Sequence, residues 1–357
     1  MYNDPTNGHA RGFVQRIALV AMVVIGAFLI VLPLATNLPA KSSATGNMMA
    51  AFRPSMTSTS LAQSATDQRT MAAMGQQVST AMLPALAAQM HMTPAQLTAY
   101  LAANDPAVAK GLSQFSTILP FFSNLEATMQ AQQSNFQQAD QIPTGFLAPT
   151  TMTWLFILPG GVLLVFGLFG LVRPRVARRM VAASGAVGVV LVIGLLSVSM
   201  FAKTTAADQM TGAFAPVFSA QNVQQARTDT NTVAAMATQF AQQAMPSFAT
   251  ALHMTPAQMS ELVATQFPAV ATGAAQLPQI VQRMEAATSL IEGNVQNYTQ
   301  SASIPWSPGS MVLMFWFMMV SALLAMAVAA GALVLTVRRH AVTRVSAPRA
   351  TSGAYRS

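Results

Sequence analysis

The chain of 357 residues has few charges for a soluble domain: 53% of its residues are hydrophobic and only 8% are charged, against roughly 25% charged in typical soluble proteins. The net charge of +8 does not indicate nucleic-acid binding, because no basic stripe is interleaved with aromatic residues. The absence of cysteine excludes disulfides, thiolate metal ligands and cysteine nucleophiles. The composition predicts a membrane protein, and its bias toward alanine and arginine favours a bacterial source.

Four apolar stretches are each long enough for a membrane-spanning helix, which requires about 20 residues. None of them contains Asp, Glu, Lys, Arg or His. The first is longer than the apolar core of a signal peptide, so we interpret it as a retained span. The expected division is an N-terminal segment 1–16, spans 17–38, 153–172, 180–202 and 309–337, outer segments 39–152 and 203–308, a basic link 173–179 and a basic tail 338–357.

Arginines gather on one side of the predicted spans. The main ones, in the short link and at the start of the tail, are Arg173, Arg175, Arg178, Arg179, Arg338 and Arg339. The positive-inside rule therefore predicts that both termini and the link are cytoplasmic, and that the two outer segments are extracytoplasmic. We expect these arginines to fix the topology and to contact anionic membrane lipid.

The string HMTPAQ occurs twice, at 91–96 and at 253–258. The same register of 162 residues gives 34 identities over 103 positions when 41–143 is compared with 203–305. The predicted spans align in this register as well. The sequence therefore predicts a tandem duplication of one unit, span–outer segment–span, whose parallel copies are related by a pseudo-two-fold axis along the membrane normal.

Both outer segments show helical periodicity and almost no strand pattern. In the first segment, large apolar residues recur in steps of three and four, at Met71, Met74, Val78, Met82 and Leu86. The second segment keeps most of this stripe, at Val233, Met236, Phe240, Ala244 and Phe248. The stripes predict a buried helical face in each segment.

Helix starts are predicted at Thr93-Pro94 and at Asp105-Pro106, because Thr and Asp are favourable N-caps and Pro is a favourable first residue. The second segment has Phe267 in place of the second cap. A separate Gln-rich helix is expected to lead back to the membrane. The predicted fold class is therefore an all-α membrane protein with four transmembrane helices and two homologous extracytoplasmic helical domains that pack together.

Copper binding is a remote alternative for the repeated string. His91, Met92, His253 and Met254 are the candidate ligands, since thioethers favour Cu(I). The favoured interpretation is a junction where one helix ends and Thr-Pro begins the next. We accordingly predict no cofactor and no resident metal.

Few groups are available for catalysis or ion coupling. Asp67 and Asp229 correspond in the repeat, and we expect them to cap a helix or pair on its surface. Lys41 and Lys203 lie just outside the first and third spans, where their ammonium groups are expected to reach lipid headgroups. The spans lack the ionisable residues that ion-coupled transporters use. The chain is therefore not expected to be an enzyme or a pump.

The sequence favours a non-enzymatic protein of the bacterial plasma membrane, acting as an accessory or scaffold subunit of a cell-envelope complex. Its expected partners are membrane lipid and another envelope protein. The alternative is a lipid or small apolar-ligand carrier with a groove between the outer domains. An apolar cavity of several hundred Å³ would favour the carrier. A tightly packed core with an exposed apolar patch would favour the partner-binding role.

Overall fold

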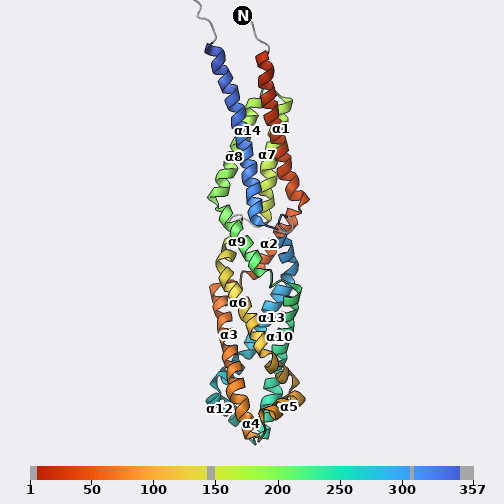
Figure 1. Cartoon of the computed structure of the whole chain (residues 1–357), viewed down its shortest axis with the longest axis vertical. Helices are drawn as coiled ribbons and strands as arrows, with labels where there is room; N and C mark the ends of the chain where they lie inside the picture. The colour runs from red at the N-terminus through yellow and green to blue at the C-terminus, as the bar shows by residue number, and fades with distance from the viewer. Residues whose placement is uncertain (1–5, 143–148, 306–308, 346–357) are drawn as a thin grey trace, which may run out of the picture. The chain divides into compact units, whose positions relative to one another are not determined.

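A computed structural model describes residues 6–142, 149–305 and 309–345 (Figure 1). Every regular element within these ranges is helical, which confirms the all-α fold. The chain divides into two compact units. Unit 1 comprises residues 1–46, 138–208 and 300–357, and unit 2 comprises residues 47–137 and 209–299. Both units combine segments from the two halves of the sequence.

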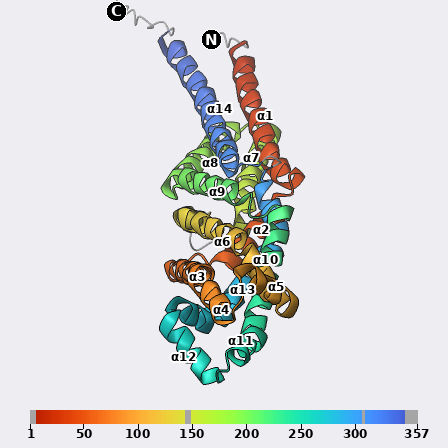
Figure 2. The same ribbon diagram turned by 60° about the horizontal axis from the view of Figure 1, so that its bottom comes forward.

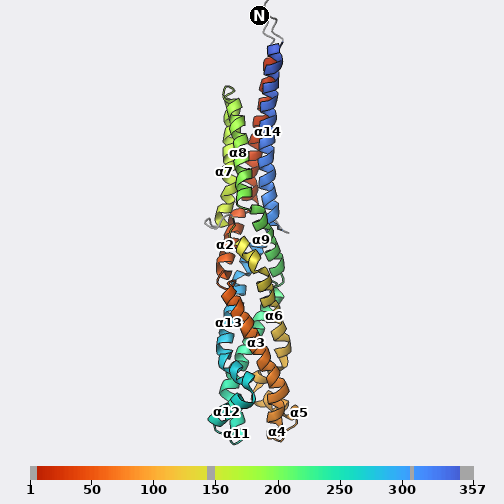
Figure 3. The same ribbon diagram turned by 90° about the vertical axis from the view of Figure 1, so that its left-hand side faces the viewer.

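Unit 1 contains the four long apolar helices, α1 (Thr6–Ala35), α7 (Trp154–Val172), α8 (Ala177–Ser197) and α14 (Met311–Val345). Each is long and apolar enough to cross a membrane. Helix α1 contacts α7 and α14, and α8 contacts the same two helices (Figure 3). A short 3₁₀ helix, η2 (Pro149–Thr153), precedes α7.

Glycine permits close approach of the helices in two matched pairs. A Cβ on Gly26 of α1 would lie 2.6 Å from the carbonyl oxygen of Gly160 in α7. A Cβ on Gly188 of α8 would lie 2.7 Å from the carbonyl oxygen of Ala322 in α14. Larger residues would force the backbones apart, so these glycines serve helix packing within the chain.

Exposed large apolar side chains are confined, in the part of the chain whose burial is described, to α1, α7, α8, α14 and Phe201. Such outward apolar faces are costly in water and suit lipid contact. Unit 2 contributes none of these exposed side chains. The apolar surface thus coincides with the helices that qualify as membrane spans.

Left-handed residues end the first and third apolar helices. Asn37 and Ser199 have φ angles of 54° and 52°, a conformation that stops a helix. Helices α2 (Leu38–Phe52) and α9 (Met200–Phe214) begin directly afterwards. The stretch 180–202, expected to be one span, therefore contains a helix end at Ser197. No Gly or Pro signals this break, which explains why the hydropathy pattern missed it.

Unit 2 is built from two series of helices whose bounds recur almost without change at an interval of 162 residues. The first series is α3 (Ser58–Gln77), α4 (Leu83–Gln89), α5 (Pro94–Asn104) and α6 (Pro106–Ala139). The second is α10 (Ala220–Gln239), α11 (Met245–Ala251), α12 (Pro256–Gln266) and α13 (Pro268–Ala302). The Gln-rich stretch expected as a separate helix is the continuation of α6. Helices α4, α5, α11 and α12 lie together at one end of unit 2 (Figure 3), the end that is turned toward the viewer in Figure 2.

A π-helical turn joins α3 to α4, and another joins α10 to α11. These turns are η1 (Val78–Met82) and η3 (Phe240–Ala244). In η1 the amide of Leu83 bonds the carbonyl of Val78, five residues back. Pro84 follows at once, and its ring lacks an N–H and crowds the carbonyl four residues earlier. Widening the ladder by one residue accommodates this ring, as is typical of π-bulges.

The core of unit 2 takes apolar side chains from both outer segments. The predicted stripe of the first segment is buried throughout, and its counterpart in the second segment is buried except for the half-buried Phe240. Both stripes belong to one continuous cluster of buried side chains. The expected pairing of the two outer segments is therefore a shared core.

Candidate functional site

The repeated string forms a helix end followed by a helix start. After α4, His91 adopts a left-handed φ of 54°, and the amide of Met92 bonds the carbonyl of Ala87 at 2.8 Å. This is the Schellman pattern of a helix C-terminus, at a position where His is tolerated better than most residues. The Thr93 side chain then accepts a bond from the Gln96 amide, and the Gln96 side chain accepts one from the Thr93 amide. This capping box confirms the predicted start of α5.

The second copy of the string repeats the same geometry. His253 has a φ of 55°, the amide of Met254 bonds the carbonyl of Ala249 at 2.8 Å, and Thr255 forms a capping box with Gln258. Both histidines are exposed. Among the described residues, no three His, Cys, Asp or Glu side chains come together. The shared string is accounted for by backbone geometry.

His91→Gly is expected to raise the free energy of unfolding by about 0.5–1 kcal/mol, because glycine adopts a left-handed φ without the Cβ strain. His91→Val is expected to lower it by about 1 kcal/mol. Thermal unfolding of the full chain in detergent measures both shifts. A loss of stability in the glycine variant would mean that the imidazole makes a contact beyond its role in the helix end.

Each outer segment caps the long helix of the other. At the start of α6, Gln239 of the second segment accepts bonds through Oε1 from the amides of Ala107 at 2.6 Å and Val108 at 3.2 Å. The sequence predicted that Asp105 would supply this cap. Asp105 is instead almost fully buried, and its Oδ2 has no hydrogen-bond partner among the described residues.

The reciprocal cap lies at the start of α13. Gln77 of the first segment accepts bonds through Oε1 from the amides of Ala269 at 2.8 Å and Val270 at 3.0 Å. This explains why Phe267 can stand at the cap position: the acceptor comes from the other segment. Gln77 and Gln239 occupy equivalent positions 162 residues apart, and this identity was the only sequence signal for the two caps. The sequence did not show which amides they bond.

Gln77→Leu and Gln239→Leu are each expected to lower the free energy of unfolding by about 1–2 kcal/mol, because each leaves two helix N-terminal amides without an acceptor. The exposed neighbour Gln76 provides the control, and Gln76→Leu is expected to stay within about 0.5 kcal/mol of the unmodified chain. Denaturant unfolding of the full chain in detergent tests this. Equal effects at positions 76 and 77 would contradict the capping role.

Asp67 forms an ion pair between the two segments, in which only the carboxylate is buried. Its Oδ1 accepts bonds from Nη2 of Arg283 at 2.8 Å and from Nε2 of Gln63 at 2.9 Å, while its Oδ2 accepts from Nε of Arg283. Asp67 is 7% exposed. The sequence expected a pair on a helix surface, whereas the partner belongs to the other segment and the carboxylate is buried.

Asp229 corresponds to Asp67 but has no such cation. It is 3% exposed and accepts a bond from Nε2 of Gln225 at 2.7 Å, while its Oδ2 has no partner among the described residues. The position corresponding to Arg283 is Phe121. Burial raises the pKa of the Asp229 carboxyl, and the Gln225 hydrogen bond opposes this rise. The matched acids therefore occupy different electrostatic environments.

Lys41 and Lys203 bond backbone carbonyls rather than reaching away from the protein as expected. Nζ of Lys41 donates to the carbonyls of Ser303 at 2.7 Å and Pro305 at 2.8 Å. Nζ of Lys203 donates to the carbonyl of Gln141 at 3.1 Å. Burial lowers the pKa of Lys41. Both lysines thus bond the chain just beyond the long helices α13 and α6, within unit 1.

Asp208 caps helix α14, a role that the sequence reasoning missed. Its Oδ1 accepts from the amide of Met311 at 2.6 Å, and its Oδ2 accepts from Oγ of Ser310 at 2.6 Å. The corresponding position in the first half is Gly46. The partners lie about a hundred residues apart in sequence, so no local pattern indicated this cap.

The link arginines are exposed at the ends of α7 and α8. Arg173 ends α7 with its guanidinium 5.0 Å from the centre of the Phe169 ring. Arg175, Arg178 and Arg179 are exposed between the two helices and in the first turn of α8. Arg338 and Arg339 continue α14, but their side chains lie outside the described part of the structure.

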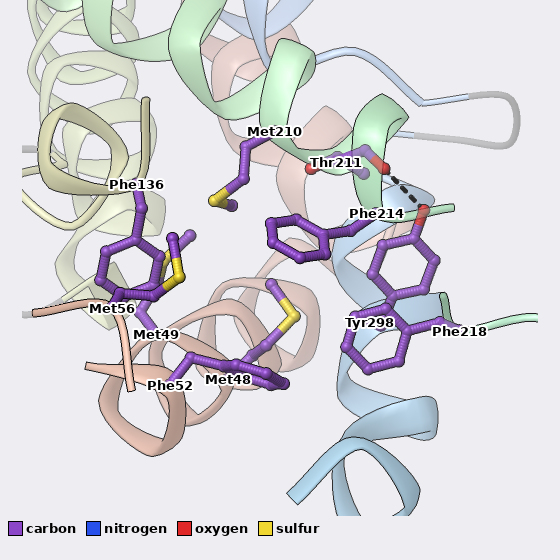
Figure 4. A pocket seen from close by; sticks show the side chains of 10 residues that line it. All are labelled: Met48, Met49, Phe52, Met56, Phe136, Met210, Thr211, Phe214, Phe218 and Tyr298. Carbon is purple, nitrogen blue, oxygen red and sulfur yellow. Dashed lines mark hydrogen bonds between the residues drawn. The ribbon is translucent and has the colours of Figure 1, made fainter. Parts of the chain in front are cut away.

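A small apolar cavity lies within unit 2 where the ends of α2 and α9 meet α6 and α13 (Figure 4). Its volume is about 20 Å³. Its lining residues are Met48, Met49, Phe52, Met56, Phe136, Met210, Thr211, Phe214, Phe218 and Tyr298.

The aromatic wall of this cavity is ordered by stacking and by one hydrogen bond. The rings of Phe218 and Tyr298 stack with centroids 4.4 Å apart. The Tyr298 hydroxyl donates to the carbonyl of Thr211 at 2.8 Å. Burial raises the pKa of Tyr298, so the hydroxyl remains a donor. The polar groups at this wall are therefore bonded to each other.

Two other hollows differ from this cavity. One, of about 40 Å³, lies in the core beside Met74, Met82 and Met236. The other is an open hollow of about 440 Å³ between α3 and α6. Its lining residues are Gln68, Arg69, Ala72, Leu119, Pro120, Ser123 and Asn124.

Over its described residues the fold is that of an all-helical protein with four apolar helices that suit a membrane, which indicates membrane association. Comparison of the chain with protein-family models and with curated proteins gives no match.

Proposed function

We propose that the chain is a multi-pass protein of the bacterial plasma membrane, made of a tandemly duplicated unit with its outer domains paired on the extracytoplasmic side. The recurrence of helix bounds at 162 residues supports the duplication. The exposed arginines between α7 and α8 support a cytoplasmic link, because basic residues are retained on that side.

We further propose that the protein is non-enzymatic and acts as an accessory or scaffold subunit of a cell-envelope complex. The observation that carries this proposal is the single shared core of unit 2, in which Gln77 and Gln239 cap helices of the opposite segment. Such a body has the rigidity that a scaffold requires. The carrier alternative needs a pocket of roughly 300–1,000 Å³, whereas the apolar cavities described above, both formed by described residues, measure about 20 and 40 Å³.

The partner contact is proposed at the open hollow between α3 and α6. No exposed large apolar side chain is found on unit 2 within its described residues, so the apolar patch that would have favoured partner binding is not seen there. The hollow instead combines polar side chains, among them Arg69, with the apolar Leu119 and Pro120, a mixed lining like that of many transient protein–protein interfaces. Arg69 would favour an acidic segment of the partner.

Site-specific cross-linking tests this assignment, because the chain has no cysteine of its own. Ser123→Cys places one thiol in the hollow, and Ser260→Cys places one on the exposed surface of α12 as a matched control. In native membranes, a cross-linked partner is expected from position 123 only, and adding Arg69→Glu should weaken it. Identical products from both positions, or none from position 123, would refute the docking site.

The proposed orientation has a separate test. A membrane-impermeant maleimide is expected to label Ser123→Cys in intact cells, and to label Arg175→Cys only after the cells are permeabilised. The opposite pattern would reverse the topology. This result is independent of whether a partner is captured.

A further inference from the structure

Four methionines surround the small cavity described above. Met48, Met49 and Met56 come from α2 and the turn that follows it, and Met210 comes from α9. All four are at most 5% exposed. Figure 4 shows their thioether groups arranged around the cavity together with the aromatic rings. Met48 and Met210 correspond in the 162-residue register, so both halves of the chain contribute a sulfur.

The size and lining of the cavity restrict its occupant. A volume of about 20 Å³ holds a single water-sized occupant, since one water requires at least about 10–15 Å³. A buried water also needs two to four polar partners. The Tyr298 hydroxyl donates to the Thr211 carbonyl, and no part of the cavity surface itself is polar. The cavity is too small for an organic ligand and too apolar for water.

We propose that this cavity is a binding site for one soft monovalent cation, Cu(I) or Ag(I), held by the thioether sulfurs of Met48, Met56 and Met210, with Met49 as a further ligand. Thioethers are neutral, polarisable ligands that select Cu(I) over hard cations. Aromatic faces add attraction for a desolvated cation. Met56 lies on the turn between α2 and α3, where its carbonyl accepts a hydrogen bond from Nε2 of Gln133 on α6.

The methionines of the second core cavity have a different arrangement. If Gly273 carried a Cβ, that atom would lie 2.6 Å from the Met74 sulfur. A Cβ on Gly111 would lie 2.4 Å from the Met236 sulfur. These two side chains therefore fill the space above glycines of the opposite segment. They act as packing groups, and with Met82 they provide a control set of equal number in the same unit.

Anaerobic titration of the full chain in detergent with Cu(I), in competition with a chromophoric Cu(I) chelator, tests the site. We expect one bound ion per chain. The triple variant Met48→Leu, Met56→Leu, Met210→Leu should bind at least about tenfold more weakly. The matched triple variant Met74→Leu, Met82→Leu, Met236→Leu should bind as the unmodified chain does. Helical circular dichroism verifies that both variants fold.

The variant His91→Ala, His253→Ala distinguishes this cavity from the repeated string. Binding is expected to persist in it, since neither histidine lines the cavity. Absence of stoichiometric Cu(I) binding by the unmodified chain would overturn the proposal. So would equal loss in the two methionine variants, or loss in the histidine variant. The inference does not depend on the scaffold role, because the titration uses the purified chain without a partner.

Discussion

Arg283→Met is expected to lower the free energy of unfolding by about 2 kcal/mol. Removing one partner of a fully buried pair costs about 3–5 kcal/mol, because the other charge stays buried and uncompensated. The Arg283 side chain is 40% exposed, so water screens part of the interaction and the expected cost is smaller. Denaturant unfolding of the full chain in detergent measures the effect.

The reverse substitution, Asp67→Asn, is expected to cost less. The guanidinium that remains is already 40% exposed and can reach water, whereas Asp67 is 7% exposed in the unmodified chain and loses its cationic partner in Arg283→Met. The double variant should be more stable than the sum of the single losses implies, which is the signature of direct coupling. Strictly additive losses would contradict an ion pair of structural importance.

The stability of the chain is expected to fall as the pH rises through the acidic range, in part because of Asp229. Its folded-state pKa lies above the ordinary Asp value, since burial penalises the charged form. The contribution of Asp229 to the free energy of unfolding is therefore fully present at pH values below the pKa of an unfolded aspartate. It is lost as the pH rises toward the raised pKa, by about 1.4 kcal/mol for each unit that separates the two values. Asp105, whose pKa burial also raises, contributes in the same direction.

Asp229→Asn should reduce this pH dependence and leave the acidic-side stability nearly unchanged, which thermal unfolding over a pH series would show. Glu261→Gln on α12 is the control, because the Glu261 side chain is exposed. A stronger test is Phe121→Arg, which places a guanidinium where the 162-residue register predicts a partner for Asp229. Loss of the Phe121 packing lowers the stability of this variant at every pH, but its stability is expected to fall less between acidic and neutral pH than that of the unmodified chain. If the stability of Asp229→Asn varied with pH as that of the unmodified chain does, Asp229 would not be a source of the pH dependence.

Local patterns in the sequence predicted the helices well. The stripe from Met71 to Leu86 is buried, and the Thr93-Pro94 start carries the expected cap. These features depend on residues within a few positions of one another, where periodicity and capping chemistry are decisive. The four apolar helices followed from composition alone.

Features that depend on distant partners were not predictable. Asp67 appeared as a surface acid because Arg283 lies 216 residues away. Gln77 and Asp208 act as caps on helices from other parts of the chain, and no local spacing identifies such a cap. The methionine cavity escaped notice for the same reason, since Met48 and Met210 meet only after both segments fold. The copper hypothesis consequently centred on the adjacent His and Met of the repeated string.

The exchanged caps also determine when unit 2 can complete its folding during synthesis of the chain. Gln77 accepts hydrogen bonds from amides that are translated 192 and 193 residues later, so it cannot cap α13 until the second segment has been made. Until α13 emerges, the buried stripe of the first segment has no complete partner, and transiently exposed apolar surface of this kind is prone to aggregation. Unit 2 therefore cannot close during translation of the first half, and we expect the newly made first segment to depend on a chaperone or on the translocation machinery until the second segment arrives.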